Sequence, residues 1–186
     1  MKYIVFFLKN SLLLICMSFI FFTACNSRKE RIDEQVSILY SNKIDIPSAE
    51  METIVCDSTY LRKKPNFRLL VYLDSTECTP CYASHHQEWE FILKECRRYE
   101  ASISLTIIIE TKNLSEDVKG KFFASNFGRT IYIDKEGAFR KRNPFFPESK
   151  IMHVLLLDEG GRVILVGNPL NNKKIEELLY SKLRNS

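Results

Sequence analysis

Two cysteines separated by two residues are the strongest chemical signal in the chain. Cys78 and Cys81 enclose Thr79 and Pro80, after a short polar stretch that follows an apolar run. At the start of a helix this spacing places the two sulfurs side by side, and free backbone amides favour the thiolate, which attacks disulfides. We therefore predict that Cys78 is the attacking sulfur and that Cys81, one turn further, resolves the mixed disulfide.

The residues beside the pair modify this chemistry. Pro80 suits the first turn of a helix, because a proline there loses no helical hydrogen bond. Glu77 places a negative charge directly before Cys78, and a nearby anion disfavours a thiolate. These neighbours predict a reductant or a moderate exchanger and not a strong oxidant. The alternative is a disulfide that only stabilises the start of the helix.

Apolar runs separated by polar breaks predict the elements that position the pair. Strands are expected at residues 53–56, 67–73, 103–109, 130–133, 154–157 and 162–166. Helices are expected at residues 78–99, 115–126 and 171–183, with a hairpin turn at 158–161. Runs in which apolar and polar residues barely alternate are typical of buried strands. The order predicts an α/β fold with a central mixed sheet and helices on both faces.

This order, with Cys78 and Cys81 opening the first long helix, resembles the thioredoxin fold and in particular the TlpA/ResA family of membrane-tethered thiol-disulfide oxidoreductases. The resemblance covers roughly Pro47 to the end and depends mainly on residues 70–73 before the pair and on residues 155–163. It implies disulfide exchange with protein clients and with a redox partner, and it implies no cofactor.

The chain departs from the family just before the predicted strand 154–157. Family members carry a cis proline there, whereas this chain has Met152 and His153. A cis bond before a residue other than proline costs about 2.5 to 4 kcal/mol, so we expect a trans bond at Met152. In a thioredoxin sheet this loop passes beside the cysteine pair, so residues 151–153 should line the site.

That departure leaves two other functions open. In a metal carrier, Cys78 and Cys81 would bind Cu(I) or Zn²⁺ together with Met152 or His153. Sco-type copper chaperones resemble this arrangement, but their spacings differ, and we favour Met152 as an apolar lid with no metal bound. The third possibility is a non-catalytic lipoprotein that uses the fold for binding.

The first 24 residues have the pattern of an export signal. Lys2 and Lys9 precede an uncharged apolar run that ends at Ala24, and Cys25 follows. Residues 22–25 resemble a bacterial lipobox, which implies that Cys25 receives acyl chains, palmitate among them, and becomes the first mature residue. Two or more such chains anchor a protein stably.

An uncleaved membrane helix over residues 3–24 is the alternative to a lipid anchor. In both cases the body lies outside the cytoplasm, on the periplasmic side or the cell surface, where a cysteine pair can be oxidised. Polar residues 25–46 predict a tether, and residues 47–186 the thioredoxin-like domain.

Composition and the remaining cysteines narrow the function further. Without Lys2 and Lys9 the chain keeps 25 of its 27 basic residues against 23 acidic ones, which predicts no nucleic-acid partner. Cys96 is predicted to be a core residue, as free cysteines commonly are. His85 and His86 are expected to be polar residues flanking the apolar face of the helix and not metal ligands.

Overall fold

The computed structural model shows two compact units, Met1–Ile38 and Leu39–Ser186. The residues that it describes are 28–56, 65–77, 79–99, 102–123 and 129–184. In the first unit, residues 28–38 are helical. The predicted export signal and Cys25 lie outside the described residues. Within the described part of the chain, no helix combines the length and apolar character needed to cross a membrane.

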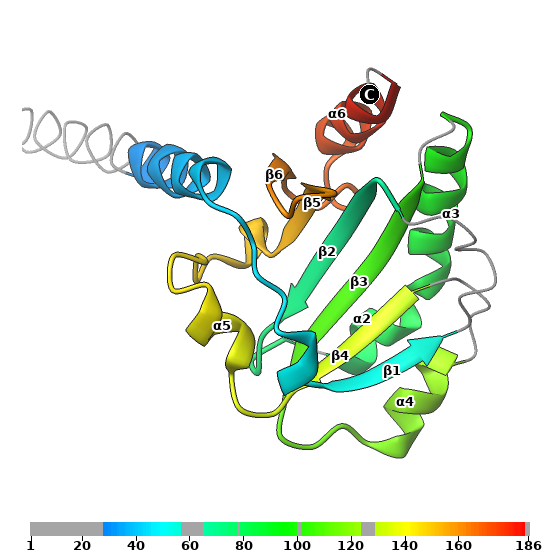
Figure 1. The fold of residues 1–186 in the computed structure, drawn as a ribbon. Coiled ribbons are helices and arrows are strands. Elements are labelled where there is room, and N and C mark those ends of the chain that lie inside the picture. Colours follow the sequence, from blue (N-terminus) through cyan, green and yellow to red (C-terminus); the bar gives the residue numbers. More distant parts are fainter. Residues whose placement is uncertain (1–27, 57–64, 78, 100–101, 124–128, 185–186) are drawn as a thin grey trace, which may run out of the picture. The chain divides into compact units, whose positions relative to one another are not determined.

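The second unit is built on a mixed six-stranded sheet with the order β1-β4-β3-β2-β5-β6 (Figure 1). Its strands are β1 (Glu52–Cys56), β2 (Phe67–Leu73), β3 (Ile103–Glu110), β4 (Arg129–Asp134), β5 (Val154–Asp158) and β6 (Val163–Val166). The pairs β2–β3 and β3–β4 are parallel, and the other three pairs are antiparallel. All six predicted strands are confirmed.

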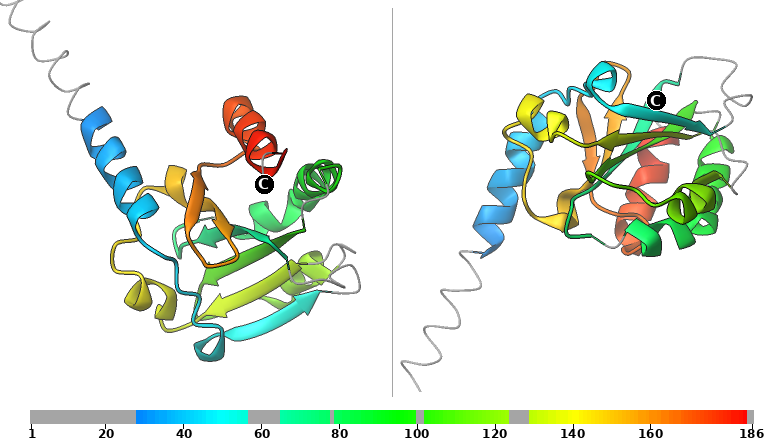
Figure 2. Two further views of the ribbon diagram at one scale, coloured as in Figure 1. Left: turned by 45° about the horizontal axis from the view of Figure 1, so that its top comes forward. Right: turned by 90° about the horizontal axis from the view of Figure 1, so that it is seen from below.

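The described residues of this unit form five α-helices beside the sheet. They are α2 (Thr79–Ser84), α3 (His86–Arg97), α4 (Glu116–Phe123), α5 (Ala138–Arg142) and α6 (Lys173–Arg184). Two short 3-10 helices, η1 (Ser48–Glu50) and η2 (Lys150–Met152), precede β1 and β5. In Figure 2 the green and red helices lie on one side of the sheet and the yellow α5 on the other.

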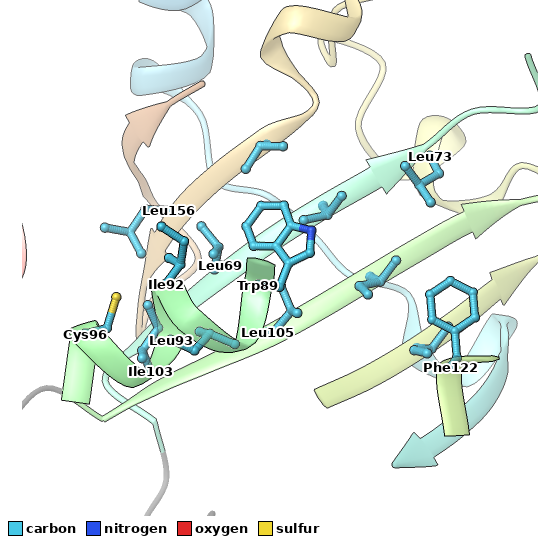
Figure 3. Packing of buried hydrophobic residues seen from close by; sticks show 14 of the residues in the cluster. Leu69, Leu73, Trp89, Ile92, Leu93, Cys96, Ile103, Leu105, Phe122 and Leu156 are labelled. Atoms are coloured by element: carbon cyan, nitrogen blue, oxygen red, sulfur yellow. The ribbon is translucent and has the colours of Figure 1, made fainter. Parts of the chain in front are cut away.

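The larger core lies between the sheet and helices α3, α4 and α6. Alternate residues of β2, such as Leu69 and Leu73, pack with Trp89 and Leu93 of α3 and with Phe122 of α4 (Figure 3). Alternate side chains of a strand point to the same face of the sheet, and residues four apart in α3 lie on the same face of the helix. These side chains therefore form one layer between the sheet and the helices. Burying one such side chain contributes about 1.5 to 3 kcal/mol, so this layer holds α3 and α4 against the sheet.

The opposite face of the sheet has a smaller aromatic core. The Tyr72 ring stacks on Phe139 of α5 with centroids 5.0 Å apart, and Phe146 meets both rings edge-on. Helices therefore cover both faces. The order β3-β2-β5-β6, with helices between β2 and β3 and a helix after the final hairpin, is that of the thioredoxin fold. The predicted fold class is confirmed.

The single helix predicted over residues 78–99 is wrong, because the chain turns at His85. The backbone of His85 has φ −90° and ψ 21°, far from the helical ψ. Its N–H donates to the Tyr82 carbonyl three residues earlier. Glu88 then lies in the first turn of a new helix, where a negative charge is favourable, and its carboxylate is 2.9 Å from His85 Nδ1.

Three further details differ from the sequence-based expectations. Helix α5 was not predicted. Leu178, expected on the buried face of the last helix, is 45% exposed. Leu39 and Ile44, within the predicted tether, are buried, and the second compact unit begins at Leu39. The predicted helix 115–126 is observed as α4, and residues 124–126 lie outside the described part.

Candidate functional site around the cysteine pair

Three of the predicted site residues, Glu77, Thr79 and Pro80, lie where β2 ends and α2 begins. Thr79 and Pro80 are the first two residues of α2, and the backbone of Cys81 lies in the same helix. Cys78 and the Cys81 side chain lie outside the described residues. The structure therefore defines the surroundings of the pair through Glu77 and the residues that contact it.

The turn before the pair is fixed by reciprocal hydrogen bonds between Asp74 and Glu77. The Asp74 N–H donates to Glu77 Oε2 at 3.0 Å, and the Glu77 N–H donates to the Asp74 carbonyl at 3.1 Å. The Asp74 carboxylate also accepts hydrogen bonds from the N–H and hydroxyl of Thr76, at 2.7 and 2.6 Å. This pattern satisfies backbone amides that precede a helix, as in a capping box.

These contacts decide the ionisation of Asp74. Partial burial raises its pKa, but the hydrogen bonds from Thr76, with the nearby Lys150 and His153, outweigh burial and hold the pKa below its usual range. The Lys150 ammonium lies 3.8 Å from Asp74 Oδ1. Asp74 is therefore a charged carboxylate that fixes the turn at neutral pH.

His153, which is distant in the sequence, contacts the same turn. Its Nδ1 is 3.3 Å from Glu77 Oε2, and its Nε2 is 3.1 Å from the Pro147 carbonyl oxygen. The His153 carbonyl accepts the Tyr72 N–H at 2.9 Å, which ties η2 and the start of β5 to β2. The imidazole stacks on Phe146, with centroids 5.5 Å apart. His153 thus contacts Glu77, the residue before the pair. That residues 151–153 lie close to the two sulfurs stays a prediction, because the sulfur atoms lie outside the described residues.

Two hollows flank this segment, and Glu77 lines both. The larger, of 470 Å³, is bordered by apolar side chains that include Leu73, Tyr82 and Trp89 and by polar ones that include Lys150. The smaller, of 260 Å³, lies toward α4 and is lined by polar groups that include Thr79 and Glu110. Glu77 therefore lines both hollows.

The other two residues of the loop before β5 have different surroundings. Met152 is buried and Ile151 is 59% exposed. The peptide bonds of the described residues are all trans, as expected for Met152. Met152 thus supplies apolar volume inside the domain, and Ile151 forms part of its surface.

Asp74, Glu77 and His153 offer one oxygen or nitrogen ligand atom each within 4.8 Å of one another. Protein donors already occupy these atoms, since Thr76 donates to Asp74 Oδ1 and the Asp74 N–H donates to Glu77 Oε2. The Lys150 ammonium adds a positive charge that disfavours a cation. We assign no metal to this group.

Sequence reasoning missed the contact between Glu77 and His153. The two contacting residues are separated by 76 positions, and no local pattern links them. The role of Asp74 could be predicted, because aspartate side chains commonly accept backbone amides before a helix, and Asp74 Oδ1 accepts the Thr76 N–H.

Comparison with known proteins gave matches among solved structures only. No protein-family model matches the chain, and no curated protein matches it. StoA from Bacillus subtilis is 15% identical with a TM-score of 0.41, over 73% of this chain and 99% of that chain. A domain of a possible thiol-disulfide isomerase from Cytophaga hutchinsonii is 15% identical with a TM-score of 0.43. The match covers 78% of this chain and 100% of that chain.

A thioredoxin-like protein from Bacteroides caccae is 14% identical with a TM-score of 0.40, over 83% of this chain and 55% of that chain. The strand order and the helix that follows β2 are described above from this chain itself. On that basis the chain has a thioredoxin-like α/β fold, as the resemblance of its sequence implied.

Proposed function

We propose that the protein is a membrane-anchored, extracytoplasmic thiol-disulfide oxidoreductase that acts through Cys78 and Cys81. The observation that carries this proposal is that Thr79, Pro80 and the backbone of Cys81 form the start of α2 after the carboxyl end of β2, and that Glu77, which precedes the pair, lines two hollows. Ligand sites in α/β sheets commonly lie at this end of the strands. A client disulfide can approach from either hollow.

In the proposed reaction the Cys78 thiolate attacks a client disulfide and forms a mixed disulfide. The Cys81 sulfur then attacks Cys78 and releases the reduced client. Helix α2 has six residues, so its dipole favours the thiolate less than the predicted long helix would. Together with the Glu77 charge, this supports a reductant or moderate exchanger.

Trapping of the mixed disulfide tests the role of each cysteine. The full-length chain in detergent should reduce insulin disulfides, and Cys78→Ser should abolish this activity. Cys81→Ser should accumulate a covalent adduct with the client, visible by non-reducing electrophoresis and lost on adding a reductant. Equal activity of Cys78→Ser and the unsubstituted protein would exclude the assignment.

Membrane anchoring through Cys25 is the second part of the proposal. It depends on the boundary between the uncharged run that ends at Ala24 and the charged residues after Cys25. Mass spectrometry of the amino-terminal peptide from bacterial membranes should show Cys25 as the first residue, carrying acyl chains. An unmodified Cys25 still joined to Ala24 would exclude a lipid anchor.

A copper or zinc carrier is the competing function. Both ring nitrogens of His153 already have partners, so a metal would have to displace one of them, and this favours disulfide exchange. Equilibrium dialysis of the reduced protein against Cu(I) or Zn²⁺ with a chelator separates the two functions. One retained metal that is lost in Cys78→Ser would favour the carrier.

A further inference from the structure

Residues 39–46, predicted as the end of the polar tether, are fixed beside β6, the strand at one edge of the sheet. Leu39 and Ile44 are buried, and the Ile44 N–H donates to the Gly161 carbonyl at 2.9 Å. We call residues 39–46 the strap. Because the strap belongs to the folded domain, the chain between Cys25 and that domain is shorter than the sequence predicted.

Two cations face each other where the strap meets the start of β6. Lys43 and Arg162 are antiparallel bridge partners, and both residues are exposed. Bridge partners have Cβ atoms about 4.5 to 5.5 Å apart on the same face of the sheet, and like charges at this spacing repel each other. Within the described residues, neither side chain forms an ion pair. A bound anion would offset the repulsion between them.

The carboxylates near this pair have contacts of their own. Asp158 Oδ1 accepts the backbone N–H of Arg162 at 2.9 Å, which holds the carboxylate within the β5–β6 turn. Asp45 is exposed, and its negative charge helps to raise the pKa of Arg142. These acids confine the positive potential to the space between Lys43 and Arg162. The pair therefore fits a single anionic group and not a broad acidic surface.

The strap also presents an aromatic ring close to the two cations. Tyr40, three residues before Lys43, is 47% exposed, and its hydroxyl interacts with the backbone of Val166 at the end of β6. Tyrosine side chains favour the boundary between lipid head groups and water, because the ring is apolar and the hydroxyl is polar. An exposed tyrosine beside two cations thus suits the head-group region of an anionic membrane.

The strap is the part of the domain closest along the chain to the proposed anchor. Residues 26–38 separate Cys25 from Leu39, and residues 28–38 are helical. That helix spans about 16 Å, and each residue outside it adds at most about 3.5 Å. Leu39 therefore lies within about 30 Å of Cys25, whatever direction the helix takes. An acylated Cys25 keeps the strap within reach of the lipid head groups.

We propose that Lys43, Arg162 and Tyr40 form a contact surface for an anionic lipid membrane, with the phosphate of one head group between the two cations. This inference rests on the proposed membrane anchoring and adds to it the face of the domain that meets the lipid. The anchor holds the surface at a high effective concentration of head groups, so two cations are enough for a contact that is weak in solution.

Lysine acetylation of the full-length chain on vesicles tests this surface. The chain is purified from bacterial membranes and reconstituted in vesicles of phosphatidylcholine, either alone or mixed with anionic phosphatidylglycerol. An uncharged acetylating reagent and mass spectrometry give the reaction rate at each lysine. Lys43 is compared with Lys174 of α6, which is also exposed and forms no ion pair within the described residues.

Anionic vesicles should slow the acetylation of Lys43 about fivefold relative to neutral vesicles, since a cation at an anionic surface gains this factor in binding. Lys174 should react equally on both. The protection of Lys43 should disappear at about 1 M salt, where charges are screened beyond about 3 Å, while the protein stays on the vesicles. Arg162→Gln and Tyr40→Ala should each lower the protection, and Lys174→Gln, the matched control, should not.

Equal acetylation of Lys43 on neutral and anionic vesicles would overturn the proposal. Equal slowing of Lys43 and Lys174 would also overturn it, because the whole domain and not this surface would then respond to the lipid. Unchanged protection of Lys43 in Arg162→Gln or in Tyr40→Ala would exclude the assigned contact.

The same experiment separates this surface from the anchor. If the chain does not stay on neutral vesicles, the proposed anchoring fails, and the contact surface is tested by adding anionic vesicles to the chain in solution. Slower acetylation of Lys43 with Lys174 unchanged would then still support the surface. No slowing of Lys43 under these conditions would overturn it.

Discussion

Asn143 and Asp45, 98 residues apart in the sequence, exchange two hydrogen bonds. The Asp45 N–H donates to Asn143 Oδ1 at 2.8 Å, and Asn143 Nδ2 donates to the Asp45 carbonyl at 2.7 Å. Nδ2 also donates to the Phe139 carbonyl at 2.7 Å. One buried amide thus holds the segment before β1 to the end of α5.

The substitution Asn143→Ala should lower the free energy of unfolding by about 1 to 3 kcal/mol, because it leaves buried backbone groups without partners. Urea denaturation followed by the fluorescence of Trp89, the single tryptophan, measures this. Asn66→Ala, at an exposed position, is the control and should stay within about 0.5 kcal/mol. Equal stability of the two variants would show that the segment is held by other contacts.

Two glycines should respond to alanine with opposite signs. Gly161, in the β5–β6 turn, has φ 80°, and a Cβ there would lie 2.9 Å from the Ile44 carbonyl oxygen. Gly161→Ala should therefore destabilise the protein by more than about 1 kcal/mol. Gly120 lies inside α4 with no atom within 4 Å of its would-be Cβ, so Gly120→Ala should stabilise it by about 0.5 to 1 kcal/mol. Thermal unfolding of both variants checks the signs.

The start of α5 depends on a single buried carboxylate. Asp134 accepts the N–H groups of Ala138 and Phe139, both at 2.8 Å, one with each oxygen. Asp134→Asn replaces one acceptor with a donor and should cost about 1 to 3 kcal/mol of stability. Urea denaturation gives the value. Asp117→Asn, on the exposed face of α4, is the control. If Asp134→Asn lowers the free energy of unfolding no more than this control does, Asp134 does not cap α5.

Cys96 should make stability fall in mildly alkaline solution. Burial raises the pKa of its thiol to about 12, so the folded protein keeps the proton that the unfolded chain loses from about pH 9 upward. The contribution of Cys96 to the free energy of unfolding is therefore fully present below pH 9. This free energy should fall by about 1 kcal/mol between pH 9 and pH 10. Urea denaturation at both values checks the slope, and Cys96→Ala should remove it. The native thiol should also resist iodoacetamide at pH 9.

The strands could be predicted because each is a run of apolar and β-branched residues that local sequence alone defines. Residues 67–73 and 103–109 are nearly uninterrupted, and both predicted ranges match β2 and β3 within one residue. A helix that begins near Pro80 could likewise be predicted, and α2 begins at Thr79.

The elements that were missed depend on groups distant in sequence or on details of backbone geometry. Helix α5 has five residues and begins at the carboxylate of Asp134, which belongs to β4. The contact between Glu77 and His153 forms only when β2 and β5 pair. The turn at His85 interrupts an apolar pattern that continues through it, because Tyr82 and Trp89 still share one side, with ring centroids 5.9 Å apart.

The turn at His85 also separates α2 from α3, so we expect the two helices to differ in amide exchange. Helix α3 is anchored by Trp89, Ile92, Leu93 and Cys96, which are all buried, so its amides should exchange with solvent only on global unfolding. Helix α2 has six residues and no continuous hydrogen-bond ladder into α3, so its amides can exchange through local opening. The segment that carries the cysteines can therefore yield to a docking client while the rest of the domain stays folded.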